Sequence, residues 1–139
     1  MTEIKRVRDW RVKLSNVIED RRRIPFSERN NCGVFLADCI IEMTGVDIFE
    51  QWPDRFRSRA EALVLLRNAG YADFCVLLAK YFEEIHPSQA RAGDVMAFPT
   101  EDQTGWAAGI VNGERVTVLS PAGLGTVSRD GATRAFRVP

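Results

Sequence analysis

Apolar residues in the first part of the chain recur every three or four positions, which is the spacing of amphipathic helices. The pattern predicts four helices, over residues 4–22, 32–44, 59–69 and 72–84. Asn31 and Ser58 stand where a helix N-cap is expected, because their side-chain oxygens can accept hydrogen bonds from the first turn. Gly45 and Gly70 stand where glycine's left-handed conformation ends a helix.

After Gly93 the pattern changes to short apolar runs bounded by turn residues, which is typical of strands. Five strands are predicted, over residues 94–98, 106–111, 114–119, 124–128 and 135–138. Asn112-Gly113 is a strong signal for a hairpin turn, and Asp94 is expected to brace a loop. Helices followed by strands predict an α+β fold, with N-terminal helices packed on one side of a five-stranded antiparallel sheet. Residues 1–139 are expected to form a single domain.

Composition narrows the classes of function. The chain has 19 basic and 19 acidic residues, and this balance argues against a dedicated nucleic-acid binder. No apolar run approaches the roughly 20 residues of a membrane span, and the N-terminus lacks the apolar segment of a signal peptide. Synthesis in the bacterial cytoplasm, without a signal peptide, is therefore expected. Cys32, Cys39 and Cys75 are odd in number and lack CxxC spacing, so neither a disulfide framework nor a metal site is predicted, and no cofactor is expected.

Cys32 is the residue with the most distinctive position. The segment Asn30-Asn31-Cys32-Gly33 changes from polar to apolar at Cys32, which places the cysteine at the start of the second predicted helix. The N-terminus of a helix presents free N–H groups and the positive end of the dipole, and both favour a thiolate over a thiol. Cys32 is therefore either a candidate nucleophile or a small apolar residue at the foot of a core helix.

The order of these features resembles a known family. A helix that begins at a cysteine, further helices, a Gly-Asp strand and a Gly-Ile-Val-Asn-Gly hairpin resemble the NlpC/P60 cell-wall peptidases. Over nearly its full length, the chain is also similar to a family of small phage and prophage proteins that are distantly NlpC/P60-like. The motifs that carry this resemblance are Trp10, Asn30-Asn31-Cys32, Ala37-Asp38, Thr44-Gly45-Val46-Asp47, Ala69-Gly70-Tyr71-Ala72-Asp73 and Phe136-Arg137-Val138. The resemblance implies a papain-like fold.

The resemblance also identifies a missing residue. In active NlpC/P60 peptidases a histidine opens the second strand, and that position corresponds to Ala107, which cannot accept a proton. A third polar residue would lie on the following strand, where Thr117 and Ser120 are the nearest candidates. The chain's single histidine, His86, precedes the first predicted strand. It is a candidate base only if the fold brings it within about 3 Å of Cys32, directly or through one water. Otherwise it is an exposed loop residue.

Two functions follow from this pattern. The missing histidine favours a non-catalytic NlpC/P60-like protein with a structural or assembly role in a phage or prophage tail. Its expected partners are other phage tail proteins, and its expected final location is the phage particle. The intact cysteine favours a cysteine-dependent peptidoglycan endopeptidase or amidase, in which Cys32 is the nucleophile, the base is unusual and peptidoglycan is the partner.

Overall fold

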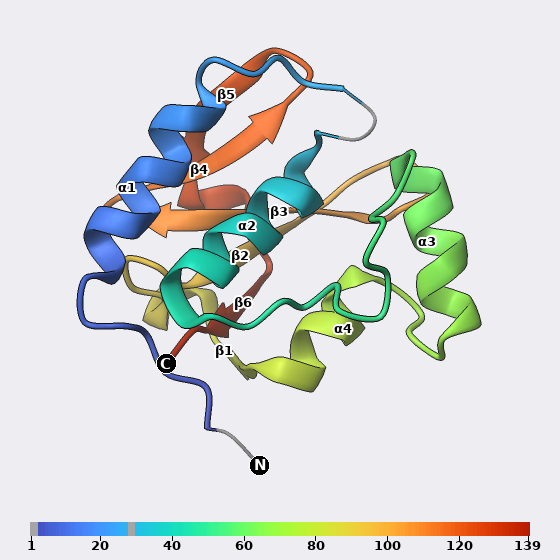
Figure 1. The fold of residues 1–139 in the computed structure, drawn as a ribbon, viewed down its shortest axis with the longest axis horizontal. Helices are drawn as coiled ribbons and strands as arrows, with labels where there is room; N and C mark the ends of the chain where they lie inside the picture. Colours follow the sequence, from blue (N-terminus) through green and yellow to red (C-terminus); the bar gives the residue numbers. More distant parts are fainter. Residues whose placement is uncertain (1–2, 28–29) are drawn as a thin grey trace.

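The computed structural model of this chain describes residues 3–27 and 30–139, and in this part four α-helices pack on one sheet (Figure 1). The helices are α1 (Trp10–Arg21), α2 (Cys32–Thr44), α3 (Arg59–Asn68) and α4 (Phe74–Tyr81). Side-chain oxygens of Asn31, Ser58 and Asp73 accept hydrogen bonds from the first turns of α2, α3 and α4. Gly45 ends α2 with a φ of 79°, as predicted.

The sheet is antiparallel throughout, and its strand order is β1-β6-β2-β3-β4-β5. The strands are β1 (Glu83–Ile85), β2 (Val95–Pro99), β3 (Trp106–Asn112), β4 (Arg115–Ser120), β5 (Gly123–Ser128) and β6 (Arg134–Arg137). Two short 3-10 helices, η1 (Pro87–Gln89) and η2 (Arg129–Gly131), lie in the connections. The α+β class and the antiparallel sheet predicted from the sequence are confirmed.

The predicted number of strands is wrong, because the described part of the sheet has six strands and not five. The additional strand, β1, occupies the end of the predicted fourth helix, which stops at Tyr81. β1 has only three residues, too few for a periodic pattern of its own. It forms because Glu83, Glu84 and Ile85 pair with Arg137, Phe136 and Ala135 of β6, which are distant in sequence. The formation of so short a strand is determined by the strand with which it pairs.

The first helix also begins later than predicted, at Trp10 and not near Ile4. The segment before it finds its hydrogen-bond partners elsewhere in the fold. The N–H of Arg6 donates to the carbonyl of Pro139 at 2.7 Å, and the N–H of Val7 donates to the carbonyl of Met43 at 2.7 Å. These contacts tie the N-terminal segment to Pro139 and to the last turn of α2, and they take the place of an extra turn of helix.

Asp94 anchors this junction from a fully buried position, with a side-chain exposure of 0%. Its Oδ1 accepts hydrogen bonds from Nη2 of Arg6 and from the N–H of Val138, both at 3.0 Å. Its Oδ2 accepts a hydrogen bond from the N–H of Arg91 at 2.8 Å and lies 3.1 Å from Nε of Arg137. The expectation that Asp94 braces a loop is confirmed, and the carboxylate also joins both ends of the described chain.

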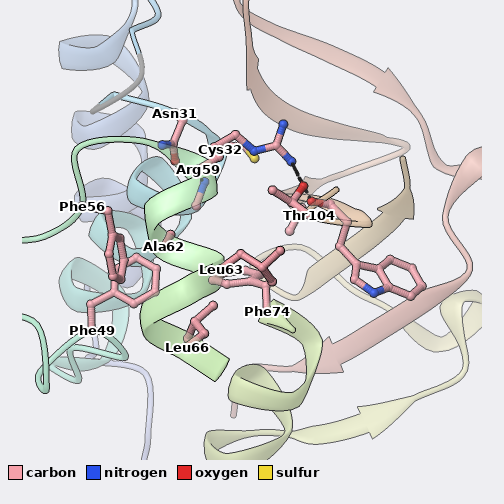
Figure 2. A pocket seen from close by; sticks show the side chains of 13 residues that line it. Asn31, Cys32, Phe49, Phe56, Arg59, Ala62, Leu63, Leu66, Phe74 and Thr104 are labelled. Carbon is pink, nitrogen blue, oxygen red and sulfur yellow. Dashed lines mark hydrogen bonds between the residues drawn. The ribbon is translucent and has the colours of Figure 1, made fainter. Parts of the chain in front are cut away.

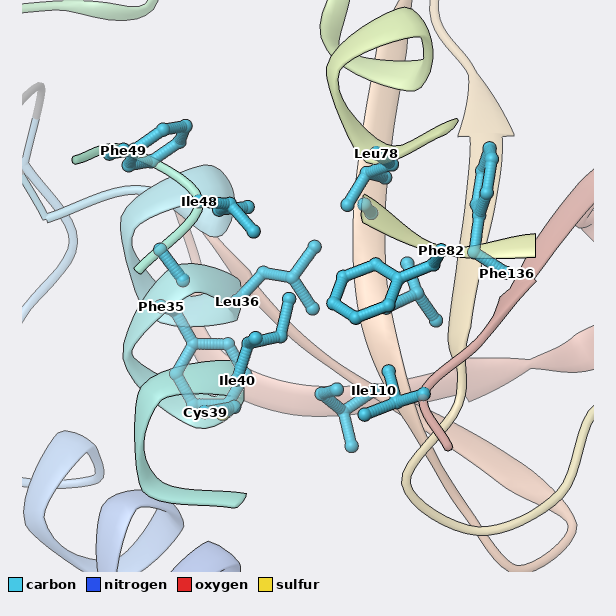
Figure 3. Packing of buried hydrophobic residues seen from close by; sticks show 14 of the residues in the cluster. Phe35, Leu36, Cys39, Ile40, Ile48, Phe49, Leu78, Phe82, Ile110 and Phe136 are labelled. Carbon is cyan, nitrogen blue, oxygen red and sulfur yellow. The ribbon is translucent and has the colours of Figure 1, made fainter. Parts of the chain in front are cut away.

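The main core lies between the helices and one face of the sheet. Figure 3 shows buried side chains of α2, including Leu36 and Ile40, facing Ile110 of β3 and Phe136 of β6. A smaller cluster covers the other face and comprises Ala90, Met96, Val111, Val116 and Ala135. Successive residues of β3 therefore alternate between the two clusters, as the pleat of a strand requires. This alternation decides which β3 residues can approach α2.

Candidate functional site

Cys32 is the first residue of α2, as the sequence predicted. The preceding residue, Asn31, has extended backbone (φ −116°), and its Oδ1 accepts hydrogen bonds from the N–H groups of Gly33 at 3.1 Å and Val34 at 3.2 Å. The cap fixes the start of the helix at Cys32, so the cysteine lies where the dipole and the free N–H groups act. Cys32 is partly exposed and forms no disulfide.

Cys32 lines a pocket between the N-terminus of α2, the helix α3 and the beginning of β3 (Figure 2). The described residues that line it with Cys32 are Asn31, Gly33, Phe49, Phe56, Arg59, Ala62, Leu63, Leu66, Phe74, Thr104, Trp106 and Ala108. Most of these side chains are apolar, and none is a histidine, a carboxylate or an amine. The cavity volume is about 50 Å³, which gives room for a few water molecules. The pocket therefore holds a thiol without a neighbouring proton acceptor among these side chains.

Arg59 is the charged side chain of the pocket, and the sequence analysis did not identify it. It is the first residue of α3, and its guanidinium reaches the loop between β2 and β3. It donates to Oδ2 of Asp102 at 2.9 Å, to Oγ1 of Thr104 at 2.7 Å and to the carbonyl of Trp106 at 2.9 Å. A basic residue in the first turn of a helix opposes the macrodipole, and this was the signal in the sequence that Arg59 has a partner elsewhere.

Asp102 is the ionic partner of Arg59. Hydrogen bonds from Thr104, with further contributions from Thr100 and Arg59, lower the pKa of Asp102 to about 2. A carboxylate with a lowered pKa stabilises the folded state at pH values above its ordinary pKa, and this contribution is lost as the pH falls toward the folded-state value. The Asp102 carboxylate is therefore ionised at neutral pH, where it pairs with Arg59.

The pleat of β3 determines which residue faces Cys32. Trp106 and Ala108 line the pocket, whereas Ala107, the position predicted for the missing base, does not. Ala107 pairs with Phe98, and Phe98 packs on the smaller cluster at the other face of the sheet. Ala108 pairs with Ala97, and both belong to the main core beside the helices. The structure thus brings the two neighbours of Ala107 to the Cys32 pocket, on the opposite face from Ala107 itself.

The two polar candidates on β4 do not line the pocket either. Thr117 is buried and pairs with Ile110 of β3. Ile110 lies farther along the strand than the beginning of β3, where the pocket is found. Ser120 is the last residue of β4, and at the turn that follows its Oγ accepts a hydrogen bond from the N–H of Ala122 at 3.2 Å and donates to the carbonyl of Gly123 at 3.3 Å. Both hydroxyl residues therefore serve the sheet and its turn rather than the pocket.

His86 lies in another part of the fold. It is exposed, follows the edge strand β1 and caps η1. Its Nδ1 accepts a hydrogen bond from the N–H of Ser88 at 3.1 Å and lies 2.7 Å from the hydroxyl of Ser88. The residues around it, Ile85 and Ala90, pack on the smaller cluster at the face away from the helices. His86 is not one of the residues that line the Cys32 pocket.

The other two cysteines are buried in the main core. Burial raises the pKa of the Cys75 thiol to about 12 and also raises the pKa of the Cys39 thiol. Both are therefore protonated and unreactive at neutral pH, and Cys32 is the thiol available to a reagent. The residues that the structure describes include no group of three or more histidines, cysteines or carboxylates arranged to hold a metal ion. No described helix has the length and apolar character that crossing a membrane requires.

Comparisons with known proteins bear on the fold. A family described as "Domain of unknown function (DUF6950)" matches residues 5–138 of the chain. No curated protein matches it. Among solved structures, the chain is similar to the crystal structure of the NlpC/p60 domain of the peptidoglycan hydrolase SagA, with a TM-score of 0.58 and 14% sequence identity. The similarity covers 91% of this chain and 97% of that chain. It confirms the NlpC/P60-type fold predicted from the sequence.

Proposed function

The chain belongs to the DUF6950 family, and on that premise we propose that it is a non-catalytic NlpC/P60-like domain. We propose further that it serves a phage particle, in the tail or in tail assembly, where its partners are other tail proteins. The composition of the Cys32 pocket supports the first proposal, that the domain is non-catalytic. The nucleophile position is filled, but the pocket-lining side chains supply no group that can take its proton.

Amide cleavage by a thiol needs proton transfer twice. A base activates the thiol, and an acid then protonates the leaving amine. Arg59 is the pocket's charged neighbour of Cys32, and a guanidinium is not deprotonated in proteins, so it cannot act as the base. We assign the position of the lost base to Trp106 or Ala108, which line the pocket, in preference to Ala107.

Several residues that carry the resemblance to phage proteins hold the fold together and lie away from the Cys32 pocket. Arg6 lies over the ring of Trp10 at 4.2 Å, and both side chains pack on Gly93, where an added Cβ would lie 2.8 Å from Arg6. Gly93 also has a φ of 88°, a conformation that favours glycine. The next residue, Asp94, binds Arg6 and Val138. Several shared motifs therefore meet in one cluster that joins the ends of the described chain, away from the Cys32 pocket.

The proposed location can be tested on particles. Particles purified from the phage or lysogen that carries the gene should contain the chain, detected by peptide mass spectrometry. A Cys32→Ala substitution should leave particle yield and infectivity unchanged, because the proposal gives the thiol no chemical role. The Asp94→Ala variant is the contrasting control, since it removes the buried anchor of the fold. Particles that lack the chain, or a loss of infectivity caused by Cys32→Ala alone, would contradict the proposal.

A cysteine-dependent peptidoglycan endopeptidase or amidase is the second candidate. One observation favours it: Cys32 is a partly exposed thiol at a capped helix N-terminus, in a fold that it shares with a peptidoglycan hydrolase domain. Under this alternative the base would come from outside the pocket's lining, and His86 is the histidine that the chain offers. Replacement of either Cys32 or His86 would then abolish peptide release.

A further inference from the structure

The loop of residues 100–105, which joins β2 to β3, is organised as a unit around Asp102. Oδ1 of Asp102 accepts hydrogen bonds from Oγ1 of Thr100 at 2.8 Å and from the N–H of Thr104 at 3.0 Å. The base of the loop is closed by the N–H of Thr100, which donates to the carbonyl of Gly105 at 2.9 Å. These internal bonds hold the shape of the loop independently of the helical layer.

The side chain of Arg59 connects this loop to the helical layer by hydrogen bonds. Its guanidinium donates to Asp102 and Thr104 in the loop and to the carbonyl of Trp106, where β3 begins. Figure 2 shows the side chain running from α3 to Thr104, with Cys32 in the same pocket. A forked guanidinium that holds several acceptors forms a contact that is geometrically specific, and a lysine could not reproduce it.

The same residues also form part of the pocket. Arg59, Thr104 and Trp106 line it together with Cys32, and its cavity volume of about 50 Å³ is smaller than that of a bulky apolar side chain. A group of that size can enter fully only if a part of this lining moves. Because the loop holds its own shape, its displacement as a unit disturbs fewer contacts than a rearrangement of the buried α2 or α3 side chains.

We propose that the loop of residues 100–105 is a lid over the Cys32 pocket and that Arg59 is the latch that holds it closed. The side chains of the latch are partly exposed, with 27% for Arg59 and 45% for Asp102, so water can replace the bonds when they break. Gly105, with a φ of 75°, ends the loop immediately before β3 and provides a flexible junction. An opened lid would admit an apolar group, because most of the remaining lining consists of phenylalanine, leucine and alanine side chains. The lid is independent of whether Cys32 is catalytic.

The lid can be tested with two uncharged thiol reagents of the same chemistry and different size, N-ethylmaleimide and N-(1-pyrenyl)maleimide. Rates of Cys32 modification are measured by intact-protein mass spectrometry and divided by the rates for free cysteine. In the Arg59→Gln variant we expect the rate with the pyrenyl reagent to rise by about tenfold relative to wild type, which corresponds to about 1.4 kcal/mol in the opening equilibrium. The rate with N-ethylmaleimide should change much less, because the smaller reagent needs a smaller opening.

The ratio of the two rates separates a lid from a change in the reactivity of the thiol, which would affect both reagents equally. Arg57→Gln is the matched control, since Arg57 is an exposed arginine two positions away that lines a different pocket. Cys32→Ser gives the background. If Arg59→Gln does not fold, the double variant Asp102→Asn/Thr104→Val is measured in its place. It weakens the latch from the loop side, and the same rise in the ratio of the two rates is expected. An unchanged ratio in the folded variants, or an equal rise in Arg57→Gln, would overturn the proposal.

Discussion

Installing a histidine at a pocket-facing position of β3 should speed the modification of Cys32 by iodoacetamide at neutral pH. Of two such variants, Trp106→His is preferred to Ala108→His. Trp106 is the first residue of β3, lines the Cys32 pocket and is larger than histidine. Ala108→His places the imidazole on the same face, but Ala108 is 1% exposed and the added volume must be accommodated in a packed core. A neighbouring imidazole increases the thiolate fraction, and because a free thiol is already a few per cent thiolate at neutral pH, we expect an acceleration of about tenfold.

Ala107→His is the matched control for this experiment. It adds an imidazole to the same strand, but on the face that carries Phe98 and the smaller cluster. The rate of Cys32 modification should therefore remain close to that of the wild type. The prediction fails if Ala107→His accelerates the reaction as much as Trp106→His, or if both pocket-facing variants fold and neither accelerates it.

Replacing Asp94 by alanine should destabilise the protein by about 3–5 kcal/mol, because it removes one partner of a buried ionic cluster and leaves the other charges unpaired. Burial is the largest influence on the pKa of Arg6 and lowers it, and the contact with Asp94 offsets part of this effect. The backbone N–H groups of Arg91 and Val138 lose their acceptor in the same substitution. Urea unfolding followed by circular dichroism measures the change, with the free energy taken from the midpoint and slope.

Glu84→Ala is the control for Asp94→Ala. Glu84 also pairs with an arginine, Arg134, at 2.7 Å, but its side chain is 41% exposed. An ion pair of this kind typically contributes about 0–1 kcal/mol, so the control should lose little stability. Equal losses for the two variants would mean that the buried cluster at Asp94 is not the main link between the ends of the described chain.

Local signals in the sequence were sufficient for the elements that depend on neighbouring residues. The start of α2 at Cys32 follows from the Asn31 cap, and its end follows from Gly45. The hairpin at Asn112-Gly113 forms, although the two residues between the strands are Gly113 and Glu114. Only the first of these has a positive φ, 69°, which corresponds to a type II′ turn and not to the type I′ turn that Asn-Gly favours.

The features that the sequence did not reveal depend on residues far apart in the chain. β1 forms because β6 offers it a partner, and the segment before Trp10 remains non-helical because it bonds to Pro139 and Met43. The faces of the sheet on which Ala107 and Ala108 lie have the same origin. A resemblance in sequence aligns a motif, but the face that a strand residue occupies is decided by its pairing with neighbouring strands.

The contact between Arg59 and the loop of residues 100–105 is a feature of the site that could not be predicted from the sequence. The sequence showed a cap at Ser58 and an arginine directly after it, but not that the guanidinium reaches a loop more than 40 positions away. The sequence showed that the chain has one histidine, but not which side chains line the pocket with Cys32. The surroundings of Cys32, an apolar pocket closed by Arg59 and Thr104, required the fold.

Release of peptides from purified peptidoglycan tests the central claim, that the Cys32 pocket does not hydrolyse amide bonds. Wild type, Cys32→Ser and His86→Ala proteins are incubated with peptidoglycan fragments, with an active NlpC/P60 peptidase as the positive control, and soluble products are identified by mass spectrometry. The account predicts that wild type and Cys32→Ser both release no more peptide than buffer, because the pocket-lining side chains include no proton acceptor for the thiol. Release by the wild type that is lost in Cys32→Ser would contradict it, and a simultaneous loss in His86→Ala would identify His86 as the base.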